Sequence, residues 1–173
     1  MAIRSGYAER ARQVSCHWRD RMERRAPLEG KVVIVTGAAG AIGRAISAHL
    51  AADGAKIVTA DLAMPPVAEV AASICADGHD AWATTVDVTL DDGPESLVRA
   101  TVEHYGRVDA IVANAGILSI RPILEMPVAE WDRIFAVNTR GVFLCFQAAA
   151  RQLVAQGTGG RLIATASISA KMG

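Results

Sequence analysis

The chain has 173 residues, of which 51% are hydrophobic and 5% are aromatic, and its formal net charge is zero. This length suits one domain with one good core, and the charge gives no electrostatic argument for binding nucleic acid or a membrane surface. No apolar run approaches the roughly 20 residues of a membrane-spanning helix, and the amino terminus lacks the apolar centre of a secretory signal.

The first 27 residues differ from the rest of the chain. They carry seven arginines against three acidic residues and show no steady hydrophobic period, so we predict a poorly ordered amino-terminal extension over 1–27. Two origins stay open: a disordered or helical arm, or an upstream start codon with translation from Met22. Glu9, Asp20 and Glu23 argue against a transit peptide.

From Leu28 the pattern becomes regular, and short β-branched runs alternate with helical periods. Strands are predicted at 31–35, 55–61, 80–88, 108–116 and 159–167. Helices are predicted at 41–50, 65–77 and 91–105, with one or two more between 127 and 156. This alternation predicts right-handed βαβ units and an α/β fold, a Rossmann-like doubly wound parallel sheet with helices on both faces.

The stretch TGAAGAIG, at 36–43, lies between the first strand and the first helix. A strand, glycine loop and helix in this order offer free backbone N–H groups and a positive helix end to a pyrophosphate. Gly37 closes the strand, and Gly43 lies in the first helical turn, where the helix must pack closely onto the strand. A tight turn without any ligand would show the same pattern.

A carboxylate at the end of the second strand adds to this pattern. Asp61 lies 18 residues beyond Gly43, where a carboxylate accepts hydrogen bonds from both ribose hydroxyls of adenosine and repels a 2′-phosphate. No arginine or lysine lies beside it in TADLAMPP. The residues therefore favour NAD over NADP, the alternative being a solvated aspartate at a strand end.

Several motifs in order resemble the short-chain dehydrogenase/reductase family: TGAAGAIG, Asp61, VDVT, ANAG, FAVNTRGVF and GGRLIATASIS. The resemblance covers 28–173 and implies an NAD-binding Rossmann domain with five of the family's seven strands. The glycine spacing fits the extended members literally, because Ala41 stands where the compact members have glycine. ANAG and Asn138 favour the compact type, and alanine at 41 adds only a methyl group.

The resemblance also implies contacts with the cofactor. Asp87 would bind the adenine amino group and Val88 would pack against the ring, while ANAG would line the ribose and the floor below the nicotinamide, although such a turn also closes a strand without a ligand. The cofactor-binding residues predicted together are Gly37, Gly40, Ala41, Ile42, Gly43, Asp61, Leu62, Asp87, Val88, Asn114, Ala115 and Gly116.

The family's chemistry uses a serine, an asparagine and a Y-x-x-x-K pair, in which the lysine and the oxidised nicotinamide lower the tyrosine pKa. Ser167 matches the serine that holds the substrate oxygen, with Ser169 as its near rival. Asn138 matches the asparagine whose backbone helps to hold a water of the proton relay. Ser167 and Asn138 are therefore the predicted catalytic residues.

The tyrosine and lysine are expected beyond Gly173. The two tyrosines of the chain, Tyr7 and Tyr105, have no lysine four positions later, and Lys171 precedes the expected position. We therefore interpret the chain as the amino-terminal part of a dehydrogenase: a truncated chain, an interrupted gene or a gene fragment. An exposed fifth strand and an uncovered helical face are expected to follow.

The sequence thus predicts an NAD-dependent oxidoreductase that interconverts a secondary alcohol and a ketone, with these 173 residues inactive alone. The stretch at 141–163, GVFLCFQAAARQLVAQGTGGRLI, resembles reductases of small diols, acetoin-like hydroxyketones and sugar alcohols. The intact enzyme is expected to be a homo-oligomer. The alternatives are an inactive NAD-binding or subunit-interacting fragment and an unstable gene remnant. Cys16, Cys75 and Cys145 lack metal-ligand spacing and are predicted to be buried, reduced thiols of a cytoplasmic protein.

Overall fold

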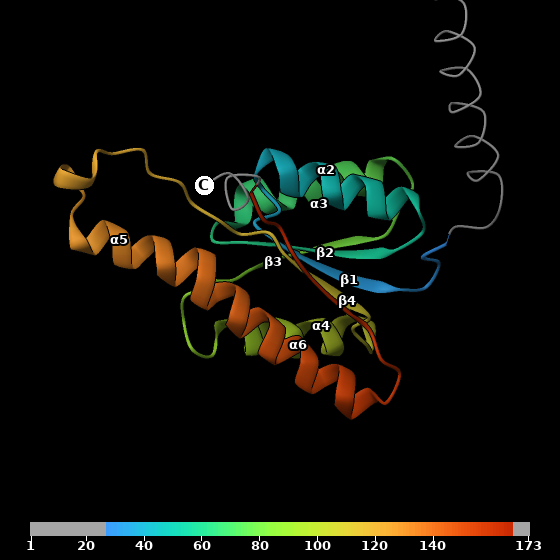
Figure 1. The fold of residues 1–173 in the computed structure, drawn as a ribbon. Coiled ribbons are helices and arrows are strands. Elements are labelled where there is room, and N and C mark those ends of the chain that lie inside the picture. The colour runs from blue at the N-terminus through green and yellow to red at the C-terminus, as the bar shows by residue number, and fades with distance from the viewer. Residues whose placement is uncertain (1–26, 168–173) are drawn as a thin grey trace, which may run out of the picture.

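The computed structural model describes residues 27–167. They form a five-stranded sheet flanked by helices (Figure 1). The strands are β1 Val32–Thr36, β2 Lys56–Asp61, β3 Ala81–Thr85, β4 Ala110–Ala113 and β5 Arg161–Ala164. The helices are α2 Ala41–Ala52, α3 Met64–Ala76, α4 Gly93–Tyr105, the 3₁₀ turn η1 Ile123–Glu125, α5 Val128–Phe135, the π-helical segment η2 Ala136–Gly141 and α6 Val142–Gln156.

The strand order is β3-β2-β1-β4-β5, and every neighbouring pair is parallel. In the central strand, Val33 stands opposite Ile57 of β2 and Ala110 of β4. The chain moves outward from β1 to β3 and then crosses back to β4, so the order reverses between β1 and β4. Such a switch point opens a crevice at the carboxyl ends of the strands. The predicted doubly wound parallel fold is confirmed.

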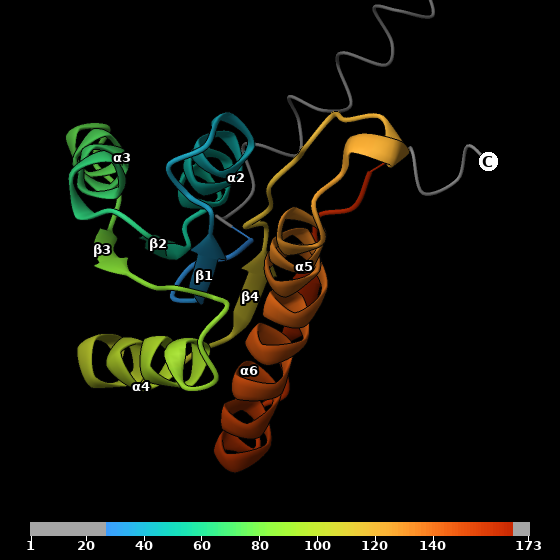
Figure 2. The same cartoon turned by 90° about the vertical axis from the view of Figure 1, so that its left-hand side faces the viewer.

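Both faces of the sheet are covered, which explains the unbroken apolar run of β1. Val33 and Val35 pack with α2 and α3 in one buried cluster, while Val32 and Ile34 pack with α4 and α6 in another. Figure 2 shows these two helical layers on opposite sides of the strands. A strand buried on both faces needs apolar residues at every position.

The first three predicted helices are also found, each with ends within about two residues of the predicted ones. Two prolines start α3, and Gly54, Gly78 and Gly106 follow α2, α3 and α4 with positive φ angles, the conformation that commonly ends a helix. The long stretch predicted to hold one or two helices forms α5 and α6, joined by the π-helical segment.

The β5 side of the molecule is more open than the β3 side. Among the described residues β5 pairs only with β4, and all four of its residues are exposed, as are Phe143 and Val154 on α6. This agrees with the expected exposed strand and uncovered helical face.

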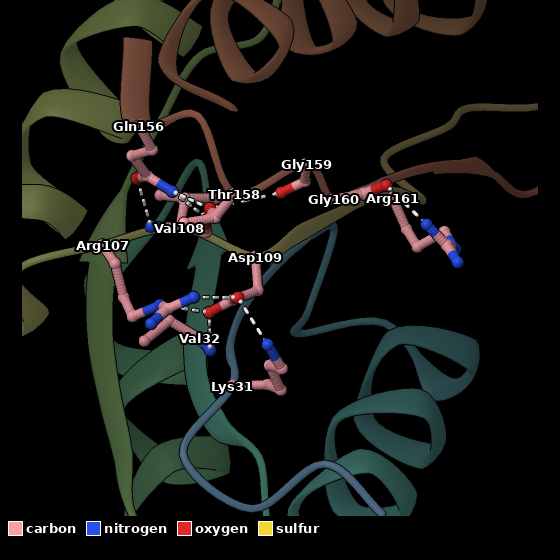
Figure 3. Close-up of polar contacts among 10 residues, drawn as sticks. All are labelled: Lys31, Val32, Arg107, Val108, Asp109, Gln156, Thr158, Gly159, Gly160 and Arg161. Carbon is pink, nitrogen blue, oxygen red and sulfur yellow. Dashed lines mark hydrogen bonds and ion pairs between the residues drawn. The ribbon is translucent and has the colours of Figure 1, made fainter. Parts of the chain in front are cut away.

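At the amino ends of the strands, Asp109 joins three segments of chain (Figure 3). Its carboxylate accepts hydrogen bonds from Arg107 at 2.6 and 2.8 Å, from Lys31 at 3.1 Å and from the Val32 amide at 3.0 Å. The Asp109 carbonyl accepts a bond from the amide of Arg161 at the start of β5. Burial opposes ionisation of this carboxyl, but these hydrogen bonds outweigh it and hold its pKa below the ordinary value.

One prediction about the cysteines is wrong. Cys145 is buried, and burial raises its pKa to about 12, but Cys75 is exposed. The buried stripe of α3 includes Val70, Ala71 and Ile74, and one further residue turns a side chain about 100° away from such a stripe. Cys16 and residues 1–26 of the predicted extension lie outside the described residues.

None of the helices in the described range combines the length and the apolar character needed to cross a membrane.

Candidate cofactor site

A cavity of about 570 Å³ lies where the carboxyl ends of β1, β2 and β4 meet. All twelve residues predicted to contact the cofactor line it, although they come from four separate stretches of the sequence. Its lining also includes Val86, Thr89, Ile117, Arg133, Ala136 and Val137, which the sequence did not single out.

Two glycines of the loop are required by close contacts. Gly37 has a φ of +65°, and a Cβ there would lie 2.7 Å from the Ala115 Cα. A Cβ on Gly43 would lie 2.2 Å from the Gly37 carbonyl oxygen. Gly40 is different, since its backbone is extended and the nearest atom to a Cβ would be 3.5 Å away. Ala41 is exposed at the first helical position, so its methyl group meets no crowding.

The loop leaves backbone donors available. No side chain caps the amino end of α2. Within the described part of the chain, the first helical amide to find an acceptor is that of Arg44, which donates to the Gly40 carbonyl. The amides before it and the helix dipole together favour an anion at this end of the cavity.

The carboxylate of Asp61 is held by two backbone amides. One oxygen accepts from Ala39 in the glycine loop at 3.0 Å, and the other accepts from Leu62 at 2.8 Å. Asp61 is half-buried and Leu62 is exposed at the rim. These bonds fix the orientation of the carboxylate and leave lone pairs on both oxygens.

The residues after β3 form another part of the wall. One oxygen of Asp87 accepts from the amide and hydroxyl of Thr89 at 2.9 and 2.6 Å. Val88 is buried and packs against Gly141, where a Cβ would approach its side chain to 2.9 Å. Val88 therefore serves the core as well as the cavity.

A hydroxyl and an amide tie the ends of β1 and β4 together. Thr36 is fully buried, and its hydroxyl oxygen accepts from the amides of Asn114 and Ala115 at 3.1 and 3.2 Å. The Asn114 side chain donates to the Thr36 and Gly37 carbonyls and accepts from Thr165 beyond β5. The sequence predicted Asn114 as a cofactor residue but did not foresee the tie through Thr36.

The predicted catalytic residues lie near this end of the sheet, outside the cavity lining. Asn138, in the π-helical segment, accepts from the Ile117 amide at 2.9 Å and donates to the Ile117 carbonyl at 2.8 Å. Ser167 is exposed three residues beyond β5. Its rival Ser169, together with Lys171, lies outside the described residues.

The described tyrosine belongs to another part of the molecule. Tyr105 ends α4, and its hydroxyl donates to Asp80 at 2.8 Å. Burial, followed by the bond and charge of Asp80, raises its pKa, which is the opposite of what a proton-accepting tyrosine needs. No cluster suited to a metal ion occurs among residues 27–167.

Comparison with known proteins identifies the family. A family model described as short chain dehydrogenase matches residues 31–173. The chain is 45% identical over 141 residues to the short-chain dehydrogenase/reductase eriH of Hericium erinaceus, covering 79% of this chain and 56% of that protein. It is 42% identical over 147 residues to an L-rhamnose 1-dehydrogenase (NAD(P)(+)) of a Sphingomonas strain, covering 84% and 58%.

Solved structures agree with the sequences. A short-chain dehydrogenase/reductase from Mycobacterium marinum superimposes with a TM-score of 0.83 at 37% identity, covering 87% of this chain and 61% of that one. An NAD⁺-bound xylitol dehydrogenase gives 0.80 at 31% identity, covering 84% and 56%. The chain thus spans little more than half the length of these relatives. On the family match and the shared fold, it belongs to the short-chain dehydrogenase family.

Proposed function

We propose that this chain supplies the NAD-binding part of an oxidoreductase that interconverts a secondary alcohol and a ketone. The observation that carries the proposal is the cavity at the switch point, in which free helix amides stand at one end and the fixed Asp61 carboxylate stands at the rim. The xylitol dehydrogenase structure of the same fold holds NAD⁺.

The residues present fit a dinucleotide. The close packing at Gly37 and Gly43 brings the loop backbone to the cavity, where the amides of Ala41 and Ile42 would hold the pyrophosphate. Asp61 would accept the ribose hydroxyls, and Asp87 has an oxygen beyond the Thr89 bonds for the adenine amino group. When bound, the nicotinamide supplies the hydride acceptor or donor.

The substrate side has fewer described residues. The hydroxyl of Ser167 would hold the substrate oxygen, and the bonds of Asn138 to Ile117 would fix the wall of the cavity below it. The 173 residues contain no Y-x-x-x-K. We therefore expect them to bind NAD without converting a substrate.

The names of relatives support a polyol or sugar-like substrate. A sorbitol dehydrogenase of Cereibacter sphaeroides is 34% identical, and another relative is named an L-rhamnose 1-dehydrogenase. We extend the proposal to a small alcohol or ketone of this kind, to a homo-oligomeric intact enzyme and to a cytoplasmic location.

Calorimetric titration of the 173-residue chain with NADH tests the proposal. We expect saturable binding that weakens about tenfold or more in Asp61→Ala, because the ribose hydroxyls lose a charged acceptor. Asp77→Ala removes an exposed carboxylate beyond the far end of α3 and serves as the matched control.

Three other outcomes would change the proposal. A folded chain without NADH binding contradicts the cofactor assignment. A chain with neither binding nor a cooperative melt is an unstable remnant. Formation of NADH from NAD and an alcohol by the pure 173-residue chain contradicts its expected inactivity.

A further inference from the structure

Arg44 crosses from α2 to α3 beside the glycine loop, just outside the residues that line the proposed cofactor cavity. It follows Gly43 on the first turn of α2. Its Nε donates to the Ala39 carbonyl at 2.9 Å, and one terminal nitrogen lies 3.4 Å from the Pro66 carbonyl oxygen and 3.7 Å from the Glu69 carboxylate. Local sequence patterns do not indicate these contacts, because Arg44 lies 22 residues before Pro66.

The backbone of Ala39 binds both the Asp61 carboxylate and the Arg44 guanidinium. The amide of Ala39 donates to the Asp61 carboxylate at 3.0 Å, while its carbonyl accepts from Arg44 at 2.9 Å. Arg44 and Asp61 do not form an ion pair within the described residues. A carboxylate and a guanidinium therefore flank the same short piece of loop without neutralising each other.

The outer end of Arg44 is held weakly. The Arg44 side chain is 43% exposed and that of Glu69 is 72% exposed, and an ion pair so open to solvent contributes little. A guanidinium keeps several donors in a planar fork that suits the oxygens of a phosphate. Arg44 can therefore exchange Glu69 for a stronger anion without losing its bond to Ala39.

We propose that Arg44 is a specificity-determining residue that receives the 2′-phosphate of NADP(H), against the repulsion that Asp61 is already expected to exert. This inference rests on the proposed function. The preference is then a balance between one attractive and one repulsive group at the adenosine ribose.

The test measures binding of NADH and NADPH by calorimetry to the 173-residue chain and its variants at low salt. Asp61→Asn removes the charge and keeps an oxygen for the Ala39 amide. We expect it to shift the affinity ratio about tenfold toward NADPH. Adding Arg44→Gln, which can still donate to the Ala39 carbonyl, is expected to abolish that shift, and Arg44→Lys in its place is expected to retain part of it.

Arg99→Met, which removes a charge from α4 on the opposite face of the sheet, is the control and is expected to leave the ratio unchanged. Should Arg44→Gln weaken both dinucleotides equally, or leave the shift intact, Arg44 only supports the loop and the inference is overturned. Absence of binding of either dinucleotide to the unmodified chain and to every variant overturns the proposed function as well.

Discussion

The two ends of the parallel sheet use their polar groups in opposite ways. At the amino ends, the carboxylate of Asp109 accepts four hydrogen bonds and its carbonyl accepts a fifth (Figure 3). At the carboxyl ends, the first amides of α2 and part of the Asp61 and Asp87 carboxylates face a cavity. One end satisfies its polar groups internally, whereas the other leaves donors and acceptors for a ligand. Polar side chains at the amino ends are therefore expected to serve stability, and those at the carboxyl ends are expected to serve binding.

The largest effect is expected at the binding end, from Gly43→Ala. A Cβ there would lie 2.2 Å from the Gly37 carbonyl oxygen, so α2 must move away from the loop. We expect the free energy of unfolding to fall by about 3 kcal/mol and NADH binding to be lost, as measured by chemical denaturation and calorimetry.

Gly40→Ala provides the matched control, because its extended backbone and open surroundings tolerate a methyl group. We expect its unfolding free energy to stay within about 0.5 kcal/mol of the parent. Equal losses in the two variants would contradict the steric account of the loop.

A smaller effect is expected at the amino end, from Asp109→Asn. The variant loses charge-assisted hydrogen bonds from Arg107 and Lys31, although both cations can return to solvent. We expect the unfolding free energy at neutral pH to fall by about 2 kcal/mol with little change in NADH affinity. Asp77→Asn is the control, since Asp77 is exposed.

The difference in unfolding free energy between the parent and Asp109→Asn is expected to depend on pH. The pKa of Asp109 is lower in the folded chain than its ordinary value, so its stabilising contribution is full above the unfolded pKa of about 3.9. It is lost as the pH falls through the folded pKa. The gap between the parent and Asp109→Asn should therefore shrink below about pH 4. A gap independent of pH would show that charge is not the cause.

The smallest effect is expected between the two ends, at Ser47 in the middle of α2. Its hydroxyl is fully buried and has no hydrogen-bond partner among the described residues. Ser47→Ala removes an unsatisfied group, so we expect a gain of about 1 kcal/mol. Ser73→Ala, at an exposed position of α3, measures the gain from helix propensity alone. Equal gains in unfolding free energy in the two variants would show that the buried Ser47 hydroxyl does not destabilise the fold.

Features that depend on local contacts could be predicted from the sequence, whereas those that depend on distant contacts could not. The four strands β1 to β4 and the α-helices between Leu28 and Gln156 follow from local period, proline and glycine, because each depends on neighbours in the chain. The cysteines show how precise such a prediction can be. Cys145 belongs to the buried face of α6, whereas Cys75 directly follows Ile74, the last buried residue of α3. A shift of one residue is enough to reverse burial on a helix.

Cavity residues could be predicted where the residue type itself indicates a special backbone conformation or close packing, as at Gly37 and Gly43. The tie between Thr36 and Asn114 was not, because it joins residues 78 apart in the chain. The position of Arg44 was not predictable either, because its contact with Pro66 joins residues 22 apart in the chain. The π-helical segment was missed because a hydrophobic period does not reveal a single extra residue in a turn.

The extra residue in η2 sets how far α6 is rotated about the helix axis relative to α5. An α-helix advances about 100° per residue, so η2 rotates α6 relative to the direction that α5 alone would give it. With this offset, Asn138 reaches the backbone of Ile117 while Gly141 meets Val88 and Cys145 enters the core. Deleting one residue between 136 and 141 would restore a continuous α-helix, in which either the Asn138 contact or the packing of α6 is kept, but not both.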